Sequence, residues 1–134
     1  MAGCIFCAIA NGDAPAAVVM RDDENCAFLD ARPLFKGHVL VVPRAHIETL
    51  GDLENVEPLF SEVQRIASAV ENALEADGTF VAINNKVSQS VPHLHVHVVP
   101  RKKGDGLRGF FWPRQKYESD QERSEYAARI AKSR

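Results

Sequence analysis

The 134-residue sequence lacks any apolar run near the roughly 20 residues that a helix needs to cross a bilayer. Its first residues show neither the basic region nor the cleavage pattern of a secretory signal. Cysteine is scarce, and its count of three is odd, which argues against a disulfide framework. Basic residues are not in excess, since 16 Lys and Arg stand against 18 Asp and Glu. We therefore expect a cytoplasmic protein with no membrane or nucleic-acid partner.

The residues that are present have the composition of an ordinary globular domain. Hydrophobic residues make up 46% of the chain and charged residues 25%. A chain of this length buries roughly two-thirds of its unfolded surface, so it can build a core without disulfides. No repeat, low-complexity tract or interdomain linker divides it. We predict a single domain over residues 1–134, in which residues 102–134 are the more variable part.

The spacing of apolar residues predicts one long helix among several short strands. Residues 55–76 carry apolar side chains at the helical period, with Asn55 as the N-terminal cap and 77–78 as the end. The apolar stripe of this helix consists of Leu59, Phe60, Val63, Ile66, Ala67, Val70 and Leu74. Strands are predicted at 17–21, 26–29, 38–42 and 80–83, and shorter helical segments at 4–10 and 119–132. Hairpin-length turns between strands favour an α+β fold: a mainly antiparallel sheet of about five strands with one long helix and a C-terminal helix.

Three of the five histidines occupy alternate positions between Val91 and Arg101. A strand over this stretch would place His93, His95 and His97 on one face and apolar residues on the other. A single histidine on such a face would most simply meet solvent, but three in strict alternation indicate a site. Imidazole near pH 7 can attack as a nucleophile, donate a proton or bind a metal. The pattern therefore indicates phosphoryl transfer, acyl transfer or a metal site.

The stretch from His93 to Val99 resembles the motif of the histidine triad (HIT) family, in which histidines alternate with hydrophobic residues. Segments 4–9, 27–30, 37–46 and 89–91 resemble the same family in the same order. This resemblance implies a HIT-like fold, a homodimer, and an enzyme that works through a nucleotidyl-histidine. It would cleave the α-phosphate linkage of a nucleoside phosphoramidate or a dinucleoside polyphosphate and release a purine nucleotide, AMP or GMP. The sequence does not choose between these two substrate classes.

The resemblance assigns different work to the three histidines. On the family template His95 is the nucleophile that attacks the α-phosphorus. His97 binds the phosphate region and helps to protonate the leaving group. His93 lies behind them, where it orients the site or binds a metal.

Nucleotide contacts are also implied by the family positions. They fall on Asp30 at the ribose hydroxyls, His38 at the nucleoside, Gln89 and Ser90 at the α-phosphate and leaving group, and Asn84 or Asn85 at the phosphate. Apart from the resemblance, Asp30 could be a turn residue, and Gln89 and Ser90 could simply face solvent. The chain departs from the family pattern at 84–89, which is shorter than usual and lacks glycine.

Cys4 and Cys7 form a Cys-x-x-Cys pair, which supplies only two of the four ligands that zinc requires. Superfamily members with such a pair complete the site with the histidine of a Pro-x-x-His segment and the first triad histidine. His46 and His93 occupy those positions, so the resemblance implies a structural Cys2His2 zinc site. A redox pair or two incidental thiols are the alternatives. Cys26 lies in an apolar run and is expected to be a buried hydrophobe.

Two other functions compete with the enzyme. One is a nucleotide-binding dimeric scaffold or regulator with little turnover. The other is a metal-dependent hydrolase with all three triad histidines as ligands, which is less favoured because alternate side chains of one strand do not converge easily on one ion. Substrate choice is expected to depend on residues 102–117, where Trp112, Arg108 and Arg114 could contact a polyphosphate or pack at a dimer seam.

Overall fold

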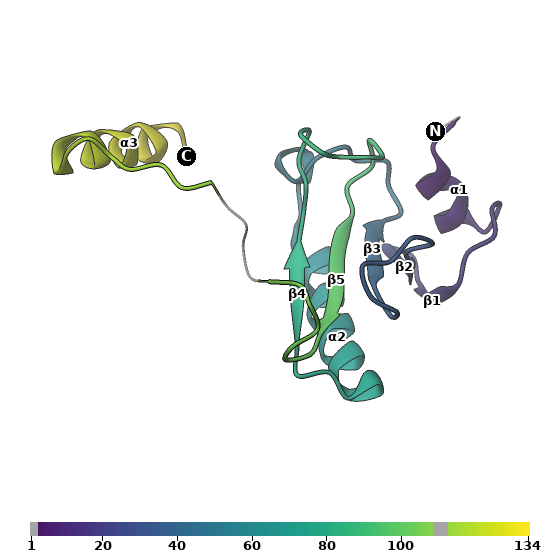
Figure 1. Ribbon diagram of the computed structural model, residues 1–134. Helices are drawn as coiled ribbons and strands as arrows, with labels where there is room; N and C mark the ends of the chain where they lie inside the picture. Colours follow the sequence, from purple (N-terminus) through teal and green to yellow (C-terminus); the bar gives the residue numbers. More distant parts are fainter. Residues whose placement is uncertain (1–2, 109–112) are drawn as a thin grey trace.

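The computed structural model describes residues 3–108 and 113–134, so Trp112 lies outside the described residues. The body of the protein is an antiparallel sheet of five strands in the order β1-β2-β3-β5-β4 (Figure 1). The strands are β1 (Val18–Arg21), β2 (Asn25–Leu29), β3 (Val39–Pro43), β4 (Gly78–Ala82) and β5 (Val96–Arg101). The helices are α1 (Ile5–Asn11), α2 (Glu57–Leu74) and α3 (Asp120–Ser133), with a 3-10 turn, η1, at Leu50–Asp52. The predicted α+β fold is confirmed.

The long helix α2 covers one face of the sheet. Its buried side chains pack on alternate residues of β3 and β5 and form the larger core. This core contains Leu59, Val63, Ile66 and Val70 of α2 with Val39, Val41, Val96 and Val98 of the sheet. Phe60 and Leu74, predicted to belong to the apolar stripe, are 38% and 41% exposed. Phe60 lies one helical step of about 100° away from Leu59 and so falls at the margin of the stripe, and Leu74 is the last residue of the helix.

A second, smaller core lies on the opposite face of the sheet, beneath α1. Phe6, Ile9 and Ala10 of α1 pack there on Phe28 and Leu40. Cys26, which is fully buried as predicted, belongs to the same cluster. The two cores thus separate a purely structural face from a face that also carries the histidines.

Several element boundaries differ from those predicted. The helix α2 ends two residues early, and Glu75 adopts the left-handed conformation with φ of 52°, so no glycine terminates it. Gly78 instead begins β4. The strand β5 starts at Val96 rather than Val91, because Pro92 has no N–H for a ladder and the backbone bends over 91–93. His93 and His95 therefore precede the strand.

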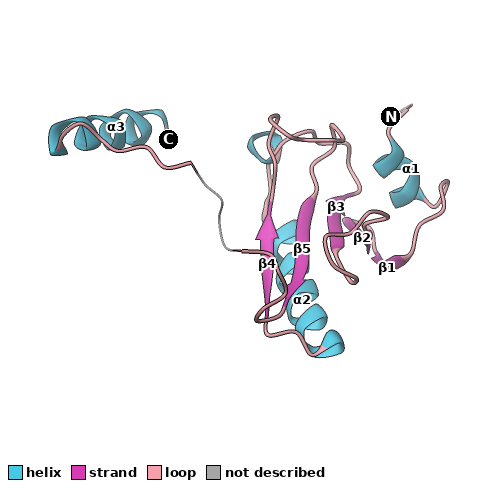
Figure 2. Ribbon diagram, viewed as in Figure 1, coloured by secondary structure: helices cyan, strands magenta, loops and turns pink. Residues whose placement is uncertain are grey.

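The C-terminal helix α3 stands apart from the sheet and the other helices (Figure 2). It begins one residue after the predicted start, because Ser119 caps it by accepting a hydrogen bond from the Glu122 N–H. None of its residues is buried. Within the described residues, no helix combines the length and apolar character that crossing a membrane requires.

Candidate functional site

Two sulfur and two imidazole groups meet between α1 and the segment that leads into β5. The Nδ1 atom of His93 lies 3.4 Å from the Sγ atoms of both Cys4 and Cys7. The Nδ1 atom of His46 lies 3.3 Å from Sγ of Cys7. All four ligand atoms lie within 4.8 Å of one another. At a tetrahedral zinc ion, Zn–S bonds of about 2.3 Å and Zn–N bonds of about 2.0 Å place sulfur and nitrogen about 3.5 Å apart. The side chains predicted for zinc are therefore spaced as such a site requires.

The hydrogen bond made by His93 shows which of its nitrogens can bind a metal. Nε2 lies 2.7 Å from the carbonyl oxygen of Pro43, which can only accept, so Nε2 carries the proton. Nδ1 then presents a lone pair to the two sulfurs. Burial lowers the pKa of His93 and raises the pKa of the Cys7 thiol. A divalent cation at the centre would stabilise the thiolate and use the neutral imidazole, so this donor set fits zinc.

His95 is fixed in one tautomer by its own neighbourhood. Its Nδ1 atom lies 2.7 Å from the backbone carbonyl oxygen of His93, so Nδ1 carries the proton and donates it. Nε2 is left with an unshared electron pair. The ring is only 3% exposed and packs edge-on against Phe6, with the ring centroids 5.1 Å apart. A buried, oriented imidazole with one free lone pair has the form of a nucleophile.

His97 belongs to a hydrogen-bonded chain whose direction can be derived from the backbone. The N–H of Leu34 donates to Nδ1 of His38 at 3.1 Å, so His38 carries its proton on Nε2. That Nε2–H donates to Nδ1 of His97 at 3.0 Å. His97 must then carry its own proton on Nε2. Burial, together with the neighbouring imidazoles of His95 and His38, lowers the pKa of His97 to about 4.

The hydrogen bonds from Leu34 to His38 and from His38 to His97 argue against a second metal site. Asp30, His38 and His97 also offer three ligand atoms within 4.8 Å of one another. A metal at Nε2 of His38 would need the proton on Nδ1, but Nδ1 accepts the N–H of Leu34. We therefore interpret this group as a proton-ordered relay. The Asp30 carboxylate stays 3.8 Å from Nε2 of His38, too far for a hydrogen bond.

A cavity of about 590 Å³ opens in front of His95 and His97. Its size is that of a pocket for a small organic ligand. Phe28 and Leu40 contribute apolar surface from the sheet. The polar residues that line it besides the two histidines are Asp30, Arg32 and Ser90. Apolar side chains together with imidazoles suit a ligand with a flat ring system and an anionic group.

Two side chains predicted to contact the phosphate, those of Gln89 and Asn85, instead make hydrogen bonds to backbone groups of the protein. The Gln89 amide donates to the Glu48 carbonyl oxygen at 2.6 Å and accepts the Lys86 N–H at 2.7 Å. The Asn85 side chain accepts the N–H of Leu50 at 2.9 Å. These contacts tie the loop between β4 and β5 to the segment before α2. Gln89 keeps one amide hydrogen for a ligand, whereas Asn85 is committed to the fold through its oxygen.

The loop at 84–89, which contains no glycine, includes two residues with a positive φ. Lys86 and Ser88 have φ of 69° and 61°, in the left-handed region that costs a residue with a side chain about 1–2 kcal/mol. Asn84 is exposed and does not line the cavity, whereas Ser90 does. The structure thus brings Asp30 and Ser90 to the cavity, leaves Asn84 outside it, and places His38 one hydrogen bond behind His97.

Sequence reasoning missed three contributors to this site. The backbone N–H of Leu34 sets the direction of the relay, and a backbone group leaves no residue-type signal. Phe6 contacts His95 and lies 6.1 Å from His93 between ring centroids. Its position between Cys4 and Cys7 is the signal that could have revealed it. Arg32 lines the cavity from the loop between β2 and β3, beside the predicted Asp30.

Comparisons with known proteins find related sequences and structures. A sequence model described as the HIT domain matches residues 11–104. "Protein hit" of Bacillus subtilis is 43% identical over 114 residues, which is 81% of this chain and 78% of that protein. The adenylylsulfatase HINT3 of Arabidopsis thaliana is 34% identical over 78% of this chain and 55% of its own length. An asymmetrical bis(5'-nucleosyl)-tetraphosphatase of Schizosaccharomyces pombe is 37% identical over 66% of this chain and 50% of its own.

Solved structures extend the comparison over nearly the whole chain. A HIT family protein from Bacillus anthracis has a TM-score of 0.89 at 32% identity and covers 99% of this chain and 98% of its own. A zinc-bound histidine triad protein from Mycobacterium smegmatis has a TM-score of 0.74 at 38% identity, with 98% of both chains covered.

Proposed function

This chain belongs to the histidine triad (HIT) family, and from that premise we propose that it is a nucleotide hydrolase or transferase acting at an α-phosphorus. The observation that carries the proposal is the tautomer of His95, whose Nδ1–H is held by the His93 carbonyl. Relatives named adenylylsulfatase and bis(5'-nucleosyl)-tetraphosphatase support a nucleotide substrate. We propose a nucleoside phosphoramidate or a dinucleoside polyphosphate as that substrate.

The first step uses the free lone pair of His95. Nε2 attacks the α-phosphorus, a nitrogen–phosphorus bond forms, and the bond from phosphorus to the leaving group breaks. The imidazole keeps its Nδ1–H on the His93 carbonyl, which stabilises the positive charge that develops on the ring. Water then attacks the phosphorus and loses a proton to solvent, the bond to His95 breaks, and the nucleoside monophosphate leaves.

His97 is placed to serve the leaving group. Nδ1 of His97 accepts from His38, and its Nε2–H has no acceptor among residues 3–108 and 113–134. The phosphates of a bound substrate favour the protonated imidazole and so raise the pKa of His97 above the low value of the free site. Protonation places an N–H on both ring nitrogens of His97, so the hydrogen bond from His38 Nε2–H to Nδ1 is broken in this state. The proton that His97 then holds passes to the departing nitrogen or oxygen. This transfer is most needed for an amine, which leaves poorly as an anion.

The cavity supplies the nucleotide contacts. Oδ1 of Asp30 accepts the Arg32 N–H at 2.9 Å, which orients the carboxylate and leaves Oδ2 to accept from a ribose hydroxyl. Phe28 and Leu40 provide apolar surface for a purine base. Ser90, and the remaining amide hydrogen of Gln89, would donate to phosphate oxygens. Asn84 would have to reorient to join them.

Zinc, when bound, would be held by Cys4, Cys7, His46 and His93 and would supply a structural cross-link with no reacting position open. The residues of the chain carry out the reaction itself. His93 connects the metal site with the nucleotide site, because its ring faces the sulfurs while its carbonyl orients His95. We also propose a homodimer. A cytoplasmic location agrees with the three free cysteines, which a reducing compartment preserves.

The function is tested with a fluorogenic AMP phosphoramidate and with diadenosine tetraphosphate. We expect His95→Ala to abolish turnover of both while the fold, followed by circular dichroism, persists. In His97→Ala the acid-labile nucleotidyl-protein should form more slowly from the phosphoramidate, because the amine then leaves without a proton. A matched control is Gln64→Ala, at an exposed position on α2 that does not line the cavity. Wild-type protein that binds AMP but turns over neither substrate would instead establish the scaffold function.

A further inference from the structure

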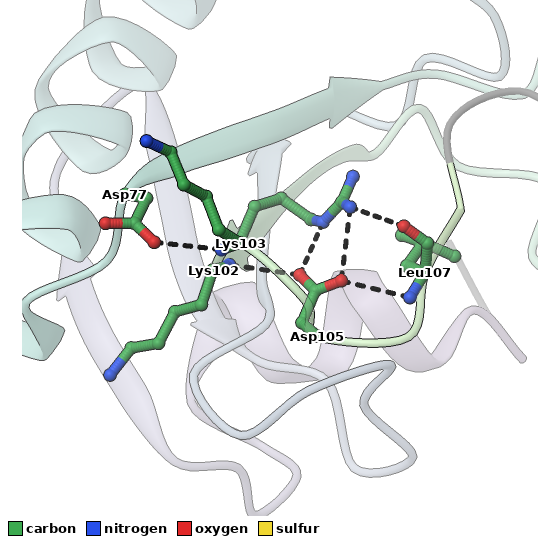
Figure 3. A network of polar contacts seen from close by, with 6 residues as sticks. Asp77, Lys102, Lys103, Asp105 and Leu107 are labelled. Atoms are coloured by element: carbon green, nitrogen blue, oxygen red, sulfur yellow. Dashed lines mark hydrogen bonds and ion pairs between the residues drawn. The ribbon is translucent and has the colours of Figure 1, made fainter.

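The side chain of Arg32 has no acceptor among the residues that the structure describes, 3–108 and 113–134. Residues 3–107 contain five arginines, and the guanidinium groups of the other four are all held. Arg21 donates to the Ile9 carbonyl oxygen, Arg44 to the Asp22 carbonyl oxygen, Arg65 to Glu62 and Arg101 to Asp105. Asp105 is itself fixed, because it also accepts the N–H groups of Lys102 and Leu107 (Figure 3). Arg32 is therefore a cation that the fold has placed without using it.

The backbone of Arg32 is nevertheless fixed beside the cavity. Oδ1 of Asp30 accepts the Arg32 N–H at 2.9 Å, which closes a turn over these three residues. Pro33 follows, and a proline restricts the backbone of the residue before it. The side chain is exposed and lines the cavity of about 590 Å³ in front of His95 and His97. A free guanidinium thus starts from a defined position at the edge of this cavity.

The polar side chains of the cavity can be matched with the parts of a nucleotide, a step that rests on the function proposed above. His95, His97 and Ser90 serve the phosphate and the leaving group, and the Asp30 carboxylate serves the ribose. Among the described residues that line the cavity, Arg32 is the polar side chain that these assignments leave over. The polar edge of the base is the part of the nucleotide that they leave without a partner.

A phosphate group on the ribose is the other acceptor that an arginine at this position could bind. The Asp30 carboxylate argues against it. Its Oδ2 atom is the one left for a ribose hydroxyl, and a phosphate in place of that hydroxyl would bring two negative charges together. An unmodified ribose fits Asp30, so the acceptor for Arg32 lies on the base.

The donors of a guanidinium distinguish between the two purines. Arginine has five N–H donors and no acceptor. Guanine presents two neighbouring acceptors, N7 and O6, on one edge, whereas adenine has N7 beside an amino group, which is itself a donor. We propose that Arg32 donates to N7 and O6 of the bound base and thereby selects guanine nucleotides over adenine nucleotides. A bidentate pair of this kind discriminates by about 5- to 150-fold. Because Arg32 is exposed, we expect about tenfold, near the lower end of this range.

The test compares substrates that differ only in the base, namely the GMP, IMP and AMP phosphoramidates of one fluorogenic amine. In wild type, kcat/KM should be about tenfold higher for the GMP substrate than for the AMP substrate. The IMP substrate should behave like that of GMP, because hypoxanthine keeps N7 and O6 and lacks only the 2-amino group. Equal values for GMP and AMP overturn the proposal. So does a preference for GMP that IMP does not share, since another edge of the base is then recognised.

Three variants examine Arg32 itself, with circular dichroism to verify the fold of each. Arg32→Ala should lower kcat/KM about tenfold more for the GMP substrate than for the AMP substrate. Arg32→Gln should shift the preference toward adenine, because a glutamine amide pairs with N6 and N7 of that base. Lys36→Ala is the matched control, since it removes an exposed cation from the same loop at a position that does not line the cavity. It should keep the preference of wild type. Equal losses for both bases in Arg32→Ala would mean that Arg32 attracts any nucleotide, and would overturn the proposal.

Binding measurements separate this proposal from the proposed hydrolase function. Calorimetry on His95→Ala, which lacks the nucleophile, should give a Kd for GMP about tenfold lower than that for AMP. If wild type turns over neither phosphoramidate, the hydrolase function fails, and the two Kd values still decide whether Arg32 selects guanine. If wild type turns over both substrates equally well, the hydrolase function stands and the role of Arg32 is overturned. Protein that binds neither nucleotide overturns both.

Discussion

The proton-ordered relay makes the stability of this protein depend on pH in a way that one substitution should remove. The pKa of His97 falls from its ordinary 6.5 to about 4 in the folded chain, first because of burial and then because of His95 and His38, while Asp30 opposes the shift. The unfolded chain therefore binds the proton more readily. The contribution of His97 to stability is complete above pH 6.5 and is lost as the pH falls toward 4.

The size of the effect follows from these two values. Between pH 7.5 and pH 5, linkage gives a loss of roughly 2 kcal/mol for a group whose pKa is 6.5 unfolded and about 4 folded. His97 is only partly buried, and solvent screening reduces the figure to about 1 kcal/mol. In His97→Gln that loss should be absent, so the variant should lose about 1 kcal/mol less than wild type over the same interval.

The measurement is urea unfolding at pH 7.5 and pH 5.0, at one protein concentration because the proposed dimer would make stability depend on concentration. Val99→Ala is the control, since it removes buried volume from the same strand without removing a proton site. We expect this control to be less stable by the same amount at both pH values. If His97→Gln shows the same pH dependence as wild type, the low pKa of His97 is wrong.

Three other predictions follow from the site. Protein purified without chelator should contain close to one zinc per chain and Cys7→Ser much less; absence of zinc together with free alkylation of Cys4 and Cys7 would refute the metal site. His97→Ala should slow hydrolysis of an AMP phosphoramidate at least about tenfold more than that of diadenosine tetraphosphate, because the amine needs the proton; equal losses in kcat/KM would contradict the role of His97. Ser88→Gly should raise the free energy of unfolding by about 0.5–1 kcal/mol by relieving a positive φ, whereas Val87→Gly, where φ is not positive, should not.

The sequence predicted this fold well where side-chain periodicity decides the structure. The apolar period of α2, and the β-branched run that became β3, specify one buried face and one buried strand. The helix end was mistaken because Glu75 takes a conformation that glycine usually takes, and residue type cannot reveal such an exception. The start of β5 shifted because alternation of side chains can continue through a bend after Pro92.

Some features of the site could likewise be predicted from the sequence and others could not. The four residues predicted to bind zinc lie together as expected, because the Cys4 and Cys7 pair at the start of α1 and the histidines of two distant segments can each be recognised as ligands. The loop contacts of Gln89 and Asn85 were not foreseen, because an amide can bind a ligand or its own backbone equally well. The donor at Leu34 was beyond reach of the sequence, because every residue except proline has the same N–H.

The carbonyl of His93 has a consequence for how this family of sites can change over generations. The proposed nucleophile, His95, takes its orientation from a main-chain oxygen, and no substitution at position 93 can delete that atom. A lineage could exchange the imidazole, and with it the metal, and still keep the acceptor for Nδ1 of His95. Residue 93 could therefore lose its part in metal binding and still keep its part in orienting His95.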